Sequence, residues 1–132
     1  MGTFPLAPGD FENVFRWGTS VLDEGKKITL HIEGFQEPLL AELTLKLVMG
    51  RYDRKASVNP DVDLTLYGAR QKGVSRRHVA LELDEDCVRV LDLGSTNSTF
   101  LNGYRLLPHQ ARILRDGDEL TLGRMKVKVN FE

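Results

Sequence analysis

The residues best suited to chemistry in this chain are arginines, hydroxyls and an amide gathered in three short segments. These segments are Gly50-Arg51, Ser75-Arg76-Arg77-His78 and Gly94-Ser95-Thr96-Asn97. Arginine supplies a fixed positive charge with forked donors, and Ser and Thr hydroxyls form short hydrogen bonds to phosphate oxygens. The set therefore indicates a site for a phosphate dianion, and we expect the phosphate to be carried by another protein.

A catalytic alternative would pair Ser75 with His78 as nucleophile and base. No oxyanion motif or nucleophile elbow accompanies the pair, and a nucleophile flanked by Arg76 and Arg77 is unusual. A small hydrolase is therefore the weakest alternative, and we expect the protein not to be an enzyme.

A metal site is not indicated either. His31 and His109 lack partners at metal-ligand spacing, and the single cysteine, Cys87, lies in the apolar pattern Cys87-Val-Arg-Val-Leu. We expect Cys87 to be a small core residue. The sequence thus predicts no metal and no cofactor.

Bulk composition narrows the class of protein further. The chain has 132 residues, 41% of them hydrophobic, and 18 basic against 19 acidic residues give a formal net charge of -1. This charge balance argues against a general nucleic-acid binder, and the hydrophobic fraction argues against disorder. No apolar run approaches a membrane span, and no secretory signal is visible, so we expect a cytoplasmic protein without membrane contact.

The elements that must position the site read as short strands. Several segments alternate apolar and polar residues with period two, which is typical of half-buried strands. They are Ile28–Ile32, Leu43–Leu47, Leu64–Leu66, Val79–Leu83, Val88–Leu93, Leu120–Leu122 and Val127–Phe131. Asn102-Gly103 is the strongest hairpin signal, because both residues tolerate positive φ. Many short strands without a second helical pattern predict an all-β sandwich or barrel.

The N-terminal part of the chain has a different residue pattern from the rest. We expect residues 1–26 to form an extension and residues 27–132 to form the β domain. Asp10 can cap a short helix from Phe11 to Trp17, whose aromatic side chains would pack on the domain. Thr19 stands before acidic residues, and we consider two alternatives for it: an ordinary linker residue, or a kinase site whose phosphorylated form occupies the domain's own phosphate site.

Four segments in order resemble the forkhead-associated (FHA) domain family over about residues 28–131. They are Gly50-Arg51, Ser75-Arg76-Arg77-His78, the run from Gly94 to Gly103 and the run from Leu114 to Gly123. The resemblance implies a β-sandwich of about eleven strands that binds phosphothreonine peptides and is not catalytic.

The resemblance also assigns roles to individual residues. Arg51 and Ser75 match the family's phosphate-binding arginine and serine, and Arg76 matches a position that touches the peptide or the phosphate. Thr96 would line the pocket for the phosphate and the threonine methyl, and Asn97 would hold the peptide backbone.

Supporting roles follow from the same comparison of motifs. Gly50 leaves room for the turn before the binding loop, and His78 would hold its loop by hydrogen bonds without touching the ligand. Arg77 is left open, since either it or Arg76 could be the functional arginine of the pair. The family usually has Gly where this chain has Ser98, and a positive φ there would cost roughly 1 kcal/mol.

The resemblance therefore predicts a phosphopeptide-binding module in signalling. Its partners would be phosphothreonine-containing targets of a Ser/Thr kinase, or the kinase itself. The alternative is a scaffold or oligomerisation sandwich whose phosphate pocket is disused. The intact Arg51, Ser75 and Asn97 count against that alternative.

Overall fold

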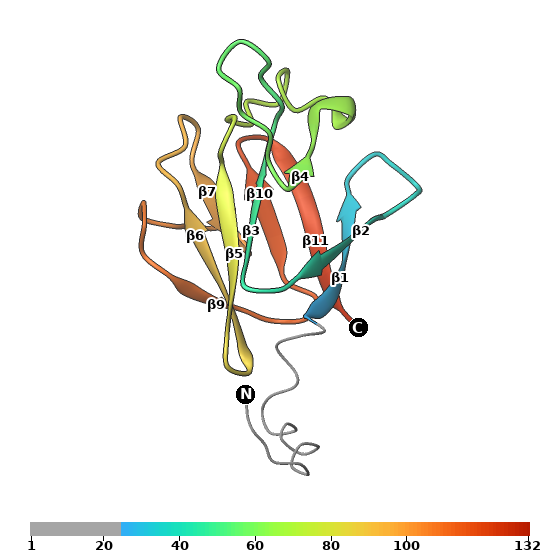
Figure 1. Cartoon of the computed structure of the whole chain (residues 1–132), viewed down its shortest axis with the longest axis vertical. Coiled ribbons are helices and arrows are strands. Elements are labelled where there is room, and N and C mark those ends of the chain that lie inside the picture. The colour runs from blue at the N-terminus through green and yellow to red at the C-terminus, as the bar shows by residue number, and fades with distance from the viewer. Residues whose placement is uncertain (1–24) are drawn as a thin grey trace.

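The computed structural model describes residues 25–132, which form two β-sheets and one short 3-10 helix (Figure 1). The elements are β1 (Lys26–Ile32), β2 (Leu39–Leu43), β3 (Lys46–Gly50), β4 (Val62–Asp63), the 3-10 helix η1 (Thr65–Tyr67), β5 (Val79–Asp84), β6 (Cys87–Asp92), β7 (Thr99–Leu101), β8 (Tyr104–Arg105), β9 (Arg112–Leu114), β10 (Glu119–Leu122) and β11 (Met125–Phe131).

The strands pack as a sandwich of two sheets. One sheet has six strands in the order β2-β1-β11-β10-β7-β8, and the other has five in the order β4-β3-β5-β6-β9. Paired strands are antiparallel except for β3 and β4, which run parallel. The predicted all-β sandwich of about eleven strands is confirmed. The expected N-terminal helix and Thr19 lie outside the described residues.

The core lies between the sheets and explains the alternating sequence. In β11, Met125, Val127 and Val129 are buried while the lysines between them are exposed. Leu81 in β5 and Val90 in β6 face this set from the other sheet, and all five are fully buried. Burial of such side chains contributes roughly 1.5–3 kcal/mol each, which makes the sandwich a rigid support for its loops.

Two strand predictions are wrong. The segment Leu43–Leu47 is not one strand: it holds the end of β2, a turn at Thr44-Leu45 and the start of β3. The segment Leu64–Leu66 runs into η1, where the Asp63 carboxylate accepts hydrogen bonds from the backbone N–H and the hydroxyl of Thr65. Side-chain hydrogen bonds of this kind favour a turn over an extended strand.

The prediction for Cys87 is also wrong, because its side chain is exposed. Cys87 is the first residue of β6, and the inward positions of that strand belong to Val88 and Val90. Alternation therefore turns Cys87 away from the core. The Asn102-Gly103 hairpin is confirmed: both residues have positive φ, 50° and 88°, and they join β7 to β8.

Three loops meet at one end of the sandwich, at the top of Figure 1. They are the β3–β4 loop (51–61), the segment between η1 and β5 (68–78) and the β6–β7 loop (93–98). The three motif segments fall on these loops or at their borders. No helix within residues 25–132 is long and apolar enough to cross a membrane.

Candidate phosphate-binding site

A hollow of about 420 Å³ opens where these loops meet, and we call it the upper hollow. It is lined by Arg51, Val58, Ser75, Arg76, Arg77, Gly94 and Thr96. Four of the five residues expected to bind the phosphopeptide are thus brought together. The fifth, Asn97, does not line the hollow, although it is the neighbour of Thr96.

Arg51 is anchored at its base and open at its tip. It follows directly on β3, its backbone N–H donates to the Arg76 carbonyl at 3.2 Å, and its Nε donates to the Val74 carbonyl at 2.9 Å. The Gly50 position is needed for this close approach, because a Cβ there would lie 1.9 Å from the Arg76 carbonyl oxygen. The guanidinium is therefore held in place through Nε while its two terminal nitrogens keep their donors.

His78 organises the loop that carries Ser75. Its ring is fully buried, and its Nδ1 accepts the backbone N–H of Ser75 at 2.9 Å. Its Nε2 lies 2.9 Å from the Ser98 carbonyl. These two contacts require the neutral tautomer that carries its proton on Nε2. Burial lowers the pKa of His78, against the opposing influences of the Ser98 carbonyl and the Asp92 charge, so the neutral form is favoured.

Ser75 joins this loop to the β6–β7 loop. Its Oγ accepts the backbone N–H of Thr96 at 3.1 Å, and its hydroxyl proton remains to be donated elsewhere. The catalytic alternative finds no support in this geometry, because the His78 ring bonds the backbone of Ser75 and not its hydroxyl.

Asp92 fixes the β6–β7 loop from below, and sequence reasoning missed it. Its buried carboxylate accepts the hydroxyls of Ser95 and Thr99 at 2.5 and 2.6 Å, and the backbone N–H groups of Gly94 and Ser95 at 2.9 and 3.1 Å. Burial alone would raise the pKa of Asp92, but these hydrogen bonds lower it below its usual value. The sequence did carry a signal for Asp92, because the alternation that buries Val88 and Val90 in β6 also turns Asp92 inward.

Asn97 and Ser98 complete the second loop. The Asn97 Nδ2 donates to the Gly73 carbonyl at 3.0 Å, which leaves its Oδ1 as an acceptor for another group. Ser98 has a φ of 71°, so it adopts the left-handed conformation that only a glycine adopts without strain. Its carbonyl accepts both His78 Nε2 and the Gly123 N–H, which holds this strained residue in place.

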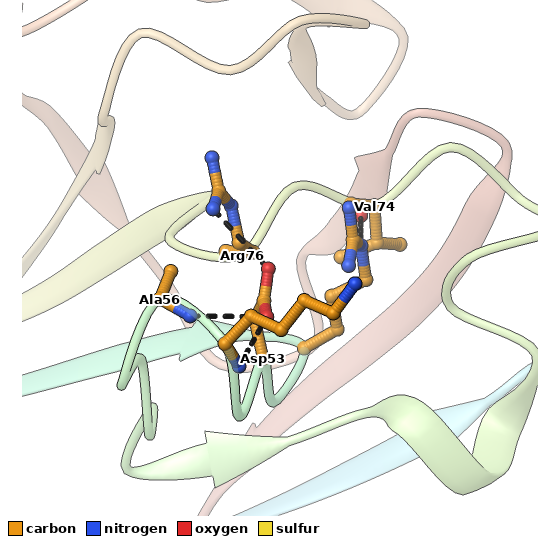
Figure 2. A network of polar contacts seen from close by, with 6 residues as sticks. Asp53, Ala56, Val74 and Arg76 are labelled. Carbon is orange, nitrogen blue, oxygen red and sulfur yellow. Dashed lines mark hydrogen bonds and ion pairs between the residues drawn. The ribbon is translucent and has the colours of Figure 1, made fainter.

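Arg76 differs from the other arginines of the hollow because it has an acidic partner. Its Nη1 lies 3.2 Å from Asp53 Oδ2, as Figure 2 shows. A hydrogen bond from the Ala56 N–H, along with contacts from Lys55 and Arg76, lowers the pKa of Asp53. Within residues 25–132, no carboxylate lies within ion-pair distance of Arg51 or Arg77. Sequence reasoning identified neither Asp53 nor Val58 as part of this region.

The arrangement can therefore bind an anion. Three arginines line the hollow, one carboxylate lies near it, and the Ser75 hydroxyl has a free proton. Across the part of the chain that the structure describes, no cluster of three or more His, Cys, Asp or Glu side chains could hold a metal ion.

Comparison with known sequences places this site in a family. The model of the FHA domain matches residues 47–123. Similar proteins include FraH of Nostoc sp., 33% identical over 95 residues, and the glycogen accumulation regulator GarA of Mycobacterium tuberculosis, 33% identical over 72 residues. The match covers 72% of this chain and 32% of FraH, and 54% of this chain and 41% of GarA. The chain thus spans less than half the length of these relatives.

Comparison with solved structures gives the same result. A structure from work on phosphothreonine-dependent FHA domain interactions is 27% identical with a TM-score of 0.61, covering 80% of this chain and 97% of the other. The FhaA FHA domain, solved in complex with the intracellular domain of Rv3910, is 27% identical with a TM-score of 0.60, covering 78% of this chain and 99% of the other. Both likenesses extend over most of the described sandwich.

Proposed function

The chain belongs to the FHA domain family, and we propose on that premise that it binds phosphothreonine-containing segments of partner proteins and catalyses no reaction. The observation that carries the proposal is the convergence of Arg51, Ser75, Arg76 and Thr96 on one open hollow from three separate loops. Guanidinium groups and a hydroxyl donor are the groups that recognise a phosphate dianion.

Each residue has a physical basis for its role. Arg51 presents its terminal nitrogens to the phosphate from a base fixed on Val74, and Ser75 donates the hydroxyl proton that its contact with Thr96 leaves free. Arg76 adds a second charge. Thr96 lines the hollow next to the threonine methyl, and the Asn97 Oδ1 accepts a backbone N–H of the peptide.

The expected affinity follows from these contacts. Hydrogen bonds to charged groups contribute roughly 1.5–3 kcal/mol each, before the costs of association. Two or three of them with modest peptide packing give about 8 kcal/mol, or a dissociation constant on the order of micromolar. The partners we propose are proteins phosphorylated by a Ser/Thr kinase, or the kinase itself.

Support for a phosphoprotein partner comes from the neighbours. One solved relative concerns phosphothreonine-dependent interactions, and FhaA is bound to an intracellular protein domain. The preformed hydrogen bonds of His78 and Asp92 beneath the loops suit such recognition, because a preorganised site loses less conformational freedom on binding.

The test is a phosphothreonine peptide library, followed by isothermal titration of a selected peptide in phosphorylated and unphosphorylated forms. We expect micromolar binding of the phosphorylated peptide and no measurable binding of the other. Equal binding of the two forms would favour a scaffold surface and would contradict phosphate recognition.

A further inference from the structure

The Asp53 carboxylate lies next to the upper hollow, because Asp53 contacts two of its lining residues, Arg76 and Val58. Its Oδ1 accepts the backbone N–H groups of Lys55 at 3.0 Å and Ala56 at 3.3 Å. The same loop is closed by two backbone hydrogen bonds between Asp53 and Val58, at 3.0 and 2.9 Å. Asp53 is thus fixed by its own turn, with Oδ2 directed at Arg76 (Figure 2). A fixed carboxylate loses little side-chain entropy when it forms an ion pair.

The three arginines of the hollow are therefore not equivalent. Arg51 is anchored by a neutral carbonyl, so its full charge is available to a ligand. Arg77 has no ion-pair partner within residues 25–132. Arg76 alone is held by a carboxylate, although its side chain remains 49% exposed and can reorient toward the hollow.

We infer that Asp53 competes with the bound phosphate for Arg76. The site therefore binds phosphate more weakly than it would if all three of its arginines were unpaired. This inference rests on the proposed function. A phosphate that enters the hollow either shares the Arg76 donors with Asp53 or takes them over. In both cases the phosphate gains less from Arg76 than it would from an unpaired guanidinium, because the ion pair with Asp53 must be shared or broken.

A positioning role for Asp53 would have the opposite effect on affinity. If Asp53 served to aim Arg76 at the phosphate, its removal would weaken binding. Competition predicts that its removal strengthens binding. Exposed ion pairs are weak and partly screened by solvent, so the gain should be only about two- to fivefold in affinity.

The chain offers a substitution that separates these roles. In Asp53→Asn the side-chain oxygen can keep the bonds to Lys55 and Ala56, while an amide NH₂ replaces the oxygen that faces Arg76. The turn is retained and the ion pair is lost. Asp86→Asn is the matched control, since it makes the same change in net charge in the β5–β6 hairpin at the other end of the sandwich.

The experiment is isothermal titration of one phosphothreonine peptide into the wild type, Asp53→Asn, Asp86→Asn, Arg76→Gln and the double variant Asp53→Asn/Arg76→Gln. We expect about two- to fivefold tighter binding for Asp53→Asn, no change for Asp86→Asn, and little or no further gain from Asp53→Asn once Arg76 is Gln.

Unchanged or weaker binding by Asp53→Asn would overturn the inference while leaving the proposed function intact. A gain that persists undiminished in the Arg76→Gln background would also overturn it, because Asp53 would then act through its field alone. If the wild type binds no phosphothreonine peptide at all, the proposed function fails and the inference fails with it.

Discussion

The sandwich has a hollow at each end, and the larger one is not the candidate site. The lower hollow, near the start of β1 and the β5–β6 hairpin, measures about 560 Å³ against about 420 Å³ for the upper one. Its lining consists of Gly25, Lys26, Lys27, Glu42, Leu83, Glu85, Asp86 and Glu132. Four acids outweigh two lysines there, whereas the lining of the upper hollow has three arginines and no acid.

The difference shows that a binding site is identified by its chemistry and its support more than by its size. In the upper hollow, buried polar groups lie directly beneath the loops: His78 holds Ser75, and Asp92 holds the loop of Gly94 and Ser95. Buried polar groups are costly unless they are satisfied, so their presence under one set of loops points to a conformation that must be kept.

Removal of Arg51 should have the largest effect. Arg51→Ala should weaken phosphothreonine-peptide binding by at least about a hundredfold, because two or more charge-assisted hydrogen bonds are lost. Isothermal titration measures the loss, and circular dichroism checks that the fold is kept. Lys27→Ala, which removes a cation from the lower hollow, is the matched control and should leave the affinity unchanged. A comparable loss in Lys27→Ala would break the contrast between the two ends.

His78 should matter next, through stability. His78→Ala should lower the free energy of unfolding by about 2–4 kcal/mol, since it leaves the Ser75 N–H and the Ser98 carbonyl without their buried partner. Urea unfolding gives the value. His31→Ala, at an exposed position of β1, should stay within about 0.5 kcal/mol of the wild type. Similar losses of unfolding free energy in both variants would show that the buried contacts of His78 stabilise the fold no more than an exposed histidine does.

The pH dependence of the wild type should report the same histidine. Burial lowers the pKa of His78 below the value of 6.5 for a free side chain, so the unfolded state binds more protons in that range than the folded state. The His78 contribution is fully present above pH 6.5 and is lost as the pH falls from 6.5 toward the folded pKa. Urea unfolding at pH 7.5 and 5.5 should show lower stability at pH 5.5. Higher stability at pH 5.5 would contradict the neutral tautomer.

Two strained residues, one at each end, should give a smaller effect of opposite sign. Ser98 and Glu85 both have positive φ, 71° and 56°, and neither is Gly. Ser98→Gly and Glu85→Gly should each raise the free energy of unfolding by roughly 0.5–1 kcal/mol, because Gly adopts this conformation without strain. Only Ser98→Gly should alter phosphopeptide affinity. A change in affinity caused by Glu85→Gly would show that the lower end of the sandwich influences binding at the upper end, and would contradict their separate roles.

The smallest effect on affinity should come from replacing phosphothreonine by phosphoserine in the peptide. If Thr96 lines the position of the threonine methyl, the phosphoserine version of a peptide loses about 0.8 kcal/mol, or roughly fourfold in affinity. Paired titrations with the two peptides decide the matter. Equal affinities would mean that the β6–β7 loop, with Ser98 in place of Gly, does not form a methyl pocket.

The fold was predictable where local chemistry and alternation agreed. Asn102-Gly103 specified a hairpin because both residues tolerate positive φ, and β11 followed from strict alternation over Val127–Phe131. Prediction failed at Leu43–Leu47, because alternation continues across the turn at Thr44-Leu45 and no Gly or Pro marks it. It also failed at Cys87, where the residue's type favoured burial but the register of β6 turned it outward.

The residues of the candidate site could be predicted from the sequence, including His78 as the support of its loop, whereas the contacts between loops could not. Arg51, Ser75 and Thr96 stand in recognisable motifs. The pairing of Asp53 with Arg76 joins residues 23 positions apart and depends on how two loops pack, which no local pattern encodes. The hydrogen bond of Asn97 to the Gly73 carbonyl is of the same kind, since it spans 24 positions.

An NMR titration of the ¹⁵N-labelled chain with a selected phosphothreonine peptide tests the central claim most directly. We predict that amide shifts will concentrate at Arg51, Ser75, Arg76, Thr96 and Asn97, and that the lower hollow around Glu85 and Asp86 will not respond. The unphosphorylated peptide should produce none of these shifts. Shifts centred on the lower hollow, or the same shifts from the unphosphorylated peptide, would contradict the account.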